Sequence, residues 1–348
     1  MDKKPIILLI LLVVLYACSG EILQSEPVKL RLMTHDSFDI GQETMAEFTE
    51  QTGIEVEIFK SGDAGAMVNK AVLAKDDPLA DVLYGVDNTF LSRALINDIF
   101  IPYESENLTQ VSEDLRLDPE SGAVPVNFGD VCLNYDKSWF AATDLEPPEN
   151  LETLVDPLYR GLTVVENPAT SSPGLAFLLA TISSYGEEGY LEYWQRLVDN
   201  DVLVTDGWEE AYYGAFTAAS DGDRPIVVSY ASSPPAEVYF AETTLDQSPT
   251  GAVVSPGSCF RQIEFAGILR GTDHEQEAQQ LIDFMLGKTF QEDIPLHMFV
   301  YPVNQTAELP EVFKQFSEIP QQPANVPYQD IARFRESWVE QWTDVVLR

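Results

Sequence analysis

The sequence predicts an α/β protein with two lobes, each built on a mostly parallel β-sheet with helices on both faces. The first observation is a regular alternation of short apolar strands with amphipathic helices, which is typical of β-α units and parallel sheets. The second is the length of 348 residues, which is enough for two domains of ordinary size. The third is a late group of strands, residues 251–269, which we expect to return to the first lobe.

The N-terminus is interpreted as an export signal and a tether. A short basic start precedes an apolar run over residues 6–17, which is shorter than the ~20 residues that cross a bilayer and fits the core of a secretory signal. The run ends Leu-Tyr-Ala-Cys, which resembles the lipobox of bacterial lipoproteins, where the cysteine carries the lipid. The sequence therefore predicts a signal peptide over residues 1–17, lipidation of Cys18, and a lipidated tether over residues 18–27.

Three β-α units follow the tether. Strands are predicted at residues 28–33, 54–59 and 81–84, and helices at residues 40–52, 63–75 and from Asn88 onward. Gly53 is expected to end the first of these helices. Because ligands of parallel sheets bind beyond the carboxyl ends of the strands, the residues that follow the strands are the candidates for a site. In this lobe they include His35, Asp36, Asp63, Asp87 and Asn88.

The middle of the chain repeats this organisation. Strands are predicted at residues 131–134, 162–165 and 226–229, and helices at residues 175–185, 189–200 and 208–219. The returning strands lead to a helix over residues 275–287, and residues 328–346 form a closing helix. We therefore assign residues 28–130 and 257–310 to lobe 1, residues 131–256 to lobe 2, and residues 311–348 to a C-terminal helical segment.

Charge and missing motifs narrow the function. The net charge of −37 disfavours nucleic acid and anionic lipid as partners, because both require a basic face. The sequence contains no nucleophile elbow, no phosphate-binding loop and no His-Glu-x-x-His motif. Its three histidines lie far apart in sequence, without the spacing of metal ligands. The sequence therefore predicts a protein that is not an enzyme and that has neither a metal site nor a cofactor.

Six sequence blocks resemble the thiamine-binding proteins of ABC importers. They are Thr-His-Asp-Ser-Phe at 34–38, Ala-Asp-Val-Leu-Tyr-Gly-Val-Asp-Asn at 80–88, Thr-Ser-Ser-Pro-Gly-Leu at 170–175, Thr-Asp-Gly-Trp-Glu-Glu-Ala-Tyr at 205–212, Ser-Tyr-Ala-Ser-Ser-Pro at 229–234 and Tyr-Pro-Val at 301–303. The resemblance implies a type II periplasmic-binding-protein fold, with two lobes joined by hinge crossovers, that closes on its ligand. It also implies a solute-binding protein that captures thiamine, thiamine monophosphate or thiamine diphosphate and delivers it to an ABC permease and its ATPase.

The same resemblance implies where the protein works. We expect an exported monomer in the periplasm or on the outer face of the cell membrane, which contacts the membrane through its N-terminal lipid only. It also implies which residues bind the ligand. These are His35, Asp36, Asp63, Asp87, Asn88, Ser171, Ser172, Trp208, Tyr230, Ser233, Phe299 and Tyr301.

The chemistry of these residues suits thiamine. A thiazolium cation requires aromatic faces and a carboxylate, and a hydroxyl or phosphate tail requires N–H or hydroxyl donors. Asp87 stands where the family has a ligand-contacting aspartate and Trp208 where it has a stacking tryptophan; the alternatives are a helix N-cap and a core indole. Ser171 and Ser172 precede Pro173, a favoured first helical residue, so they could hold a phosphate or merely cap the helix.

Other positions depart from the family. His35 and Phe299 stand where relatives carry tyrosine and tryptophan, and both keep the aromatic character. Arg224 stands where an acidic residue is expected, which removes a second carboxylate for the cation. The alternative within the same fold is a receptor for ferric ion, a polyamine or another small ion, because Tyr212 and Tyr213 resemble the paired tyrosines of ferric-binding proteins. An extracytoplasmic hydrolase is a third alternative, for which no nucleophile is visible.

Two cysteines besides Cys18 are expected to form a disulfide. Cys132 and Cys259 each lie on a predicted strand at a crossover between the lobes. Hinge crossovers run side by side in the implied fold, and an exported protein reaches an oxidising compartment.

Overall fold

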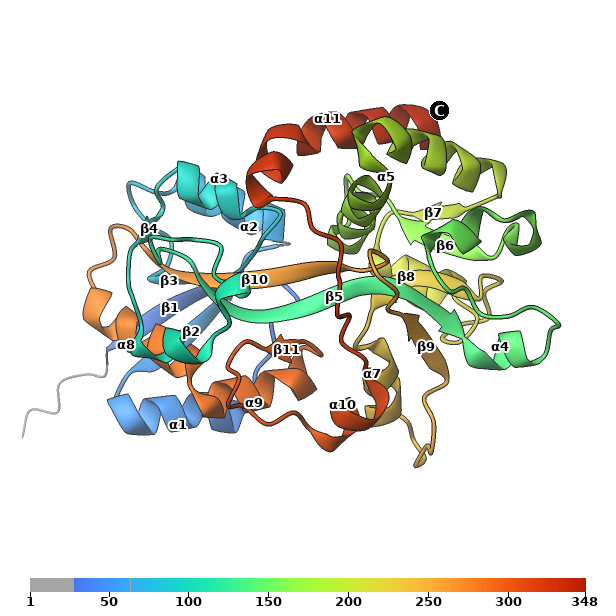
Figure 1. Cartoon of the computed structure of the whole chain (residues 1–348). Helices are drawn as coiled ribbons and strands as arrows, with labels where there is room; N and C mark the ends of the chain where they lie inside the picture. The colour runs from blue at the N-terminus through green and yellow to red at the C-terminus, as the bar shows by residue number, and fades with distance from the viewer. Residues whose placement is uncertain (1–27, 63) are drawn as a thin grey trace, which may run out of the picture.

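The computed structural model of the chain describes residues 28–62 and 64–348. The predicted signal peptide, Cys18, the tether and Asp63 lie outside the described residues. The long strands β5 (Val124–Asp136) and β10 (Phe260–Leu269) run side by side through the middle of the molecule, with one lobe at each end of the pair (Figure 1).

Lobe 1 contains the three predicted β-α units. Strand β1 pairs in parallel with both β2 and β3. Gly53 ends the first helix in the left-handed conformation, with φ 74°, as predicted. The elements are β1 (Lys29–Thr34), α1 (Gln42–Thr52), β2 (Glu55–Lys60), α2 (Ala64–Leu73), β3 (Val82–Asp87), α3 (Leu91–Ile96) and β4 (Phe100–Ile101).

The two long strands carry the chain between the lobes. β10 pairs antiparallel with β3 and with β5, so this late strand returns to the first lobe as predicted, whereas β9 (Thr250–Val253) pairs with the lobe 2 half of β5. The other half of β5 pairs with strands of lobe 2, which continues the sheet in the order β2-β1-β3-β10-β5-β8-β6-β7. The predicted fold class, an α/β fold of two lobes with hinge crossovers, is therefore confirmed.

Lobe 2 follows the same plan. Its elements are α4 (Lys137–Ala141), β6 (Thr163–Glu166), α5 (Ser172–Asp199), β7 (Leu203–Thr205), α6 (Trp208–Glu210), β8 (Ile226–Tyr230), α7 (Ser233–Tyr239) and β9 (Thr250–Val253). Short 3-10 turns occupy Leu151–Val155 and Pro157–Tyr159 in this lobe, and Glu106–Gln110 and Glu113–Leu115 in lobe 1. The two helices predicted between residues 175 and 200 lie within α5, which is interrupted at Gly186, where φ is 73° and ψ is 171°.

One predicted helix is shorter than expected. Residues 208–219 form only α6 and a π-helical turn over Ala211–Ala215. Phe216 is completely buried and forms an isolated parallel bridge with Arg224, so the chain leaves the helix in an extended conformation.

Each lobe has its own hydrophobic core. The core of lobe 1 also receives α8 (Glu275–Leu286) and α9 (Lys288–His297), which precede the short strand β11 (Tyr301–Pro302). The two cores divide on β5 between Val126 and Val131, and on β10 between Phe260 and Ile263. The hinge strands are therefore the elements that both cores share.

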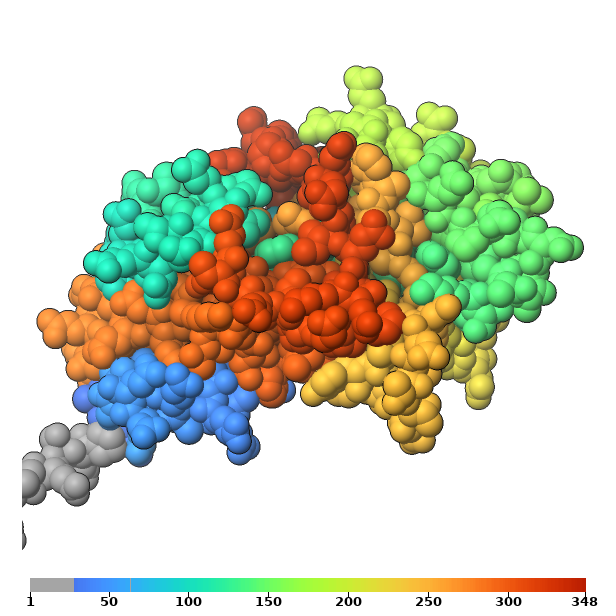
Figure 2. Space-filling view, turned by 60° about the horizontal axis from the view of Figure 1, so that its bottom comes forward, coloured from blue at the N-terminus to red at the C-terminus, as the bar shows by residue number. Residues whose placement is uncertain are grey.

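The C-terminal segment crosses back over the hinge. After α10 (Glu311–Phe316) the chain lies beside the start of β10, where Ala324 N donates to the carbonyl of Cys259 at 2.6 Å. In the space-filling view these red-orange residues lie between the blue and teal side of lobe 1 and the green and yellow side of lobe 2 (Figure 2). This is a third connection between the lobes.

The closing helix α11 (Tyr328–Val346) touches both lobes. Trp342 is completely buried and meets Trp194 of α5 edge to face at 5.4 Å. At the other end, Arg335 lies over the ring of Phe90 in lobe 1 at 4.3 Å, and Ser92 Oγ donates to the carbonyl of Tyr328. The helix is therefore fixed in the core of lobe 2 and contacts lobe 1 at its first turns.

Cys132 on β5 and Cys259 before β10 form a disulfide, with Cα atoms 4.3 Å apart. Both cysteines are completely buried at the hinge. Across residues 28–62 and 64–348, no helix is both long and apolar enough to cross a membrane.

Candidate functional site

Strand ends from both lobes meet around Tyr230, the last residue of β8. Burial raises the pKa of its phenol, and the charges of Glu264 on β10, Glu166 on β6 and Asp87 on β3 raise it further. The Tyr230 hydroxyl donates to Gln262 Oε1 on β10 at 3.3 Å. Because these groups come from lobe 1, lobe 2 and the hinge, Tyr230 marks the place between the lobes where a ligand could be held.

The wall from lobe 1 is a polar network around Glu264. His35 Nε2 lies 3.1 Å from Glu264 Oε1, and Asn127 Nδ2 donates to Glu264 Oε2 at 2.7 Å. Asn127 also donates to the Tyr84 hydroxyl at 2.6 Å. Glu264 lies opposite Asp87 in the β10–β3 ladder, so the network places two carboxyls side by side.

The charges in this network are coupled. Burial alone would lower the pKa of His35, but Glu264 and Asp87 outweigh it and raise that pKa. Burial would raise the pKa of Glu264, but the charge and hydrogen bonds of His35 and Asn127 hold it below its usual range. His35 and Glu264 therefore form an ion pair that faces the site.

Gly85 makes room for the His35 ring. Its φ is +94°, and a Cβ atom there would lie 2.2 Å from His35 Cδ2. A side chain at this position would therefore both strain the backbone and displace the imidazole.

Asp87 is buried and caps the chain that follows β3. Its Oδ1 accepts hydrogen bonds from Thr89 N at 2.7 Å and from Thr89 Oγ1 at 2.5 Å. Burial and Glu264 raise its pKa, while Thr89 and Arg335 oppose the rise. Asn88 next to it is bound to β10, because its side chain donates to the carbonyl of Arg261 and accepts from Ile263 N.

The wall from lobe 2 is built around Trp208, whose ring is partly exposed. Its Nε1 donates to Ser229 Oγ at 2.9 Å, and Ser229 Oγ lies 2.8 Å from Ser233 Oγ. One face of the indole is stacked on Tyr212 at 4.9 Å, and the Tyr212 hydroxyl donates to the partly buried Glu237. These contacts fix the plane of the indole.

The N-terminus of α5 adjoins this wall. Ser171 is the N-cap, and its Oγ accepts a hydrogen bond from Gly174 N at 3.3 Å. Thr170 Oγ1 donates to the carbonyl of Asp206 at 2.7 Å, which links this helix start to the loop before Trp208. Ser172 is partly exposed at the first turn, where backbone N–H groups favour an anion.

Three other expected residues lie apart from this group. Asp36 is exposed, and its Oδ1 accepts from Gly62 N at 2.9 Å between the loops that follow β1 and β2. Phe299 has φ +52° and lies in an aromatic cluster with Tyr239 and Phe240 of lobe 2. Tyr301 is 1% exposed and is stacked on Phe128 at 5.3 Å, in the packed interior of the hinge.

Sequence reasoning missed Glu264, Asn127, Gln262 and Glu166. Gln262 and Glu264 are polar residues two apart in the mainly apolar strand Phe260–Leu269. Asn127 interrupts a similar run in β5. That spacing places such side chains on one face of a strand and was the available signal.

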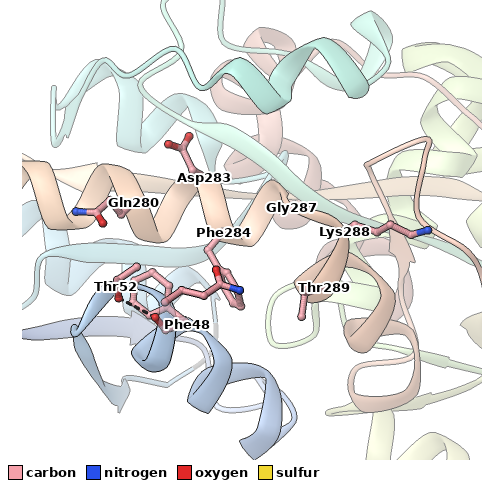
Figure 3. Close-up of a pocket in the computed structure, with 9 residues that line it drawn as sticks. Phe48, Thr52, Gln280, Asp283, Phe284, Gly287, Lys288 and Thr289 are labelled. Carbon is pink, nitrogen blue, oxygen red and sulfur yellow. Dashed lines mark hydrogen bonds between the residues drawn. The ribbon is translucent and has the colours of Figure 1, made fainter.

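Away from the strand ends a pocket of about 360 Å³ lies wholly within lobe 1 (Figure 3). Its lining comes from α1, α8 and the start of α9, for example Phe48, Phe284 and Thr289. It contains none of the residues around Tyr230. Within the described residues no group of three His, Cys, Asp or Glu side chains is arranged to hold a metal ion.

Comparison with known families decides the class of protein. Residues 77–333 match the family of bacterial extracellular solute-binding proteins. The chain belongs to this family. This is a family of exported binding proteins and not of enzymes, and membership implies a small-molecule ligand.

Individual relatives fit this family. The chain is 30% identical to a thiamine-binding periplasmic protein of Brucella melitensis, over 92% of each chain. A solved structure of a periplasmic thiamin binding protein superposes with a TM-score of 0.75 at 26% identity, covering 92% of this chain and 96% of that one. Iron-bound HitA from Pseudomonas aeruginosa superposes equally well, with a TM-score of 0.75, at 21% identity over 92% of this chain and 99% of that one; it shares the fold.

Proposed function

We propose that this solute-binding protein captures thiamine or one of its phosphates and delivers it to an ABC importer. The observation that carries the proposal is a pair of carboxyls, Asp87 and Glu264, on paired strands. Both raise the pKa of Tyr230, which directly follows the Ser229 that accepts the Trp208 hydrogen bond. An organic cation requires this combination of negative charge and aromatic surface. The names of the relatives support the same ligand class.

Each part of thiamine has a complementary group in this site. The thiazolium lies near Asp87 and Glu264, and one ring of the ligand stacks on the face of Trp208 that Tyr212 leaves open. The hydroxyl or phosphate tail lies at the start of α5, with Ser171 and Ser172. Tyr230 and Ser233 complete the wall of lobe 2, and closure of the lobes brings the two walls onto the ligand.

The remaining parts of the proposal concern the cell. A permease with its ATPase receives the ligand from the closed form. The lipid on Cys18 holds the protein at the membrane while it captures ligand, since a tether raises the local concentration at the permease.

A ferric-ion receptor is the alternative, and the geometry does not favour it. Tyr213 is 61% exposed and its ring lies at 75° to that of Tyr212. The Tyr212 hydroxyl is already bound to Glu237, so the two phenols do not converge on one point.

Calorimetric and tryptophan-fluorescence titration of the purified protein tests the proposal. Thiamine should bind and change the Trp208 emission, whereas ferric citrate should produce no visible tyrosinate-to-iron absorption band. Absence of thiamine binding together with such a band would overturn the proposal in favour of iron.

A further inference from the structure

Glu166 is a buried carboxyl without a partner. The residue is 0% exposed, and neither Oε1 nor Oε2 forms a hydrogen bond with another residue among residues 28–62 and 64–348. Buried polar groups in folded proteins are nearly always hydrogen-bonded, and an unpaired one is destabilising. A position that retains such a group therefore requires an explanation other than stability.

The strand register shows which way Glu166 faces. Val164 pairs with Val227 of β8, and both pack in the small core that contains Tyr212. Side chains alternate along a strand, so Glu166 and Ser229, each two residues further on, lie on that same face. Ser229 accepts the Trp208 hydrogen bond, so Glu166 lies on the Trp208 side of the sheet.

The carboxyl is surrounded by the three loops of the lobe 2 wall. α5 starts six residues later, and its Gly174 packs so closely that a Cβ atom there would lie 2.5 Å from the Glu166 carbonyl oxygen. On one side Glu166 pairs with Thr205, which leads to Trp208, and on the other β8 ends at Tyr230. Glu166 is the last residue of β6, as Asp87 is of β3.

We propose that Glu166 is the lobe 2 counterpart of Asp87 and binds the aminopyrimidine ring of the ligand, so that the ligand is held between two carboxyls. The inference rests on the proposed function and names the second carboxyl of that site. Both carboxyls lie close enough to the Tyr230 phenol to raise its pKa. Because Glu166 is fully buried, the Tyr230–Ser233 turn moves aside when the ring enters.

The protonation state of Glu166 suits this partner. Burial raises its pKa well above the usual value, which favours the neutral, protonated acid over the carboxylate. A neutral carboxyl presents one donor and one acceptor. An aminopyrimidine presents the complementary edge, with an amino donor beside a ring-nitrogen acceptor.

Two substitutions separate ligand recognition from packing. Glu166→Gln keeps one donor and one acceptor, and should bind thiamine within about threefold of the parent. Glu166→Leu removes both, and should weaken binding about 10- to 100-fold, the value of two lost hydrogen bonds. Thr163→Val is the matched control. It removes the Thr163 hydroxyl, which like the Glu166 carboxyl is buried and unpartnered but lies at the other end of β6, and it should leave thiamine affinity unchanged.

Calorimetric titration of thiamine into each variant, with thermal melts of the ligand-free proteins, tests whether Glu166 binds the ligand. The ligand-free leucine variant should melt no lower than the parent, because it loses only an unsatisfied carboxyl.

If the parent binds thiamine and the leucine variant binds it equally well, the inference is wrong and the proposed function stands. If the glutamine variant is as weak as the leucine variant, recognition by a donor and an acceptor is wrong. If the parent fails to bind, the proposed function itself fails. Glu166→Met replaces the leucine variant if the latter does not fold.

Discussion

The ion pair between His35 and Glu264 predicts that thiamine affinity depends on pH. With Nε2 only 3.1 Å from the Glu264 carboxylate, a protonated His35 neutralises the charge that would otherwise attract the ligand. The His35 pKa is raised by Glu264 and Asp87, so the imidazolium persists above the usual value of about 6.5. A cationic ligand therefore competes with an internal cation at low pH, and its affinity should rise as the pH increases through the pKa of His35.

The size of this change in thiamine affinity follows from the repulsion between the two cations. Two unit charges ~7 Å apart at an effective dielectric constant of ~20 repel by about 2 kcal/mol, which corresponds to ~30-fold in affinity. Titrating thiamine calorimetrically at several pH values between 6 and 8 should show part or all of this rise in the parent. The His35→Gln variant lacks this charge repulsion. Because both proteins retain Glu166, the difference between their pH profiles of thiamine affinity is due to His35.

A matched control and a second readout accompany this test. His297 forms its ion pairs with Asp39 and Asp293 at the end of α9, so His297→Gln should keep the parent profile. The stability of the ligand-free protein should change in the opposite sense: a raised His35 pKa stabilises the fold at low pH, and this is lost as the pH rises through it. Parallel binding profiles of the parent and His35→Gln would refute the competition.

Other predictions concern the remaining parts of the site and the hinge. Asp87→Asn keeps the acceptor for Thr89 but loses the charge. Calorimetry should show thiamine binding weakened about 10- to 150-fold, the value of a charged hydrogen bond, with little change in melting temperature. Unchanged affinity would exclude Asp87 from the site. Trp208→Phe keeps a ring on Tyr212 but loses a stronger cation-binding surface, and should cost about 0.5–2 kcal/mol of binding free energy by the same measurement. Thiol titration of the unreduced, denatured exported protein should find neither Cys132 nor Cys259 free, and replacing both by serine should lower the free energy of unfolding by about 2–4 kcal/mol in denaturant melts.

The fold was largely predictable because its signal is local. Alternating strands and helices, together with a stop such as Gly53, are properties of short segments, so the β-α units of both lobes could be placed from the sequence. The exception near residue 211 has a non-local cause. Phe216 forms a bridge with Arg224, a contact that no helical periodicity reveals.

The site was predictable only where it follows strand ends. Asp87, Trp208 and Tyr230 belong to loops that parallel sheets place at one edge, whereas Glu264 and Asn127 lie within strands. Their role depends on the register of β10 against β5, which is fixed by pairing between segments far apart in the chain. Tyr301 shows the same limit, because its pairing with Phe128 places it in the interior of the hinge.

The unequal attachment of α11 offers a way to measure lobe movement directly. The helix is anchored in lobe 2 through Trp338 and Trp342 but meets lobe 1 only through contacts such as Arg335 over Phe90. Any rotation of one lobe against the other therefore changes that separation while the rest of the helix moves as one body with lobe 2. A pair of fluorophores, one beyond the C-terminus of α11 and one on the exposed end of α3, would convert opening and closing into an optical signal. The same chain could then report the concentration of its solute in living cells, without any change to the residues that bind it.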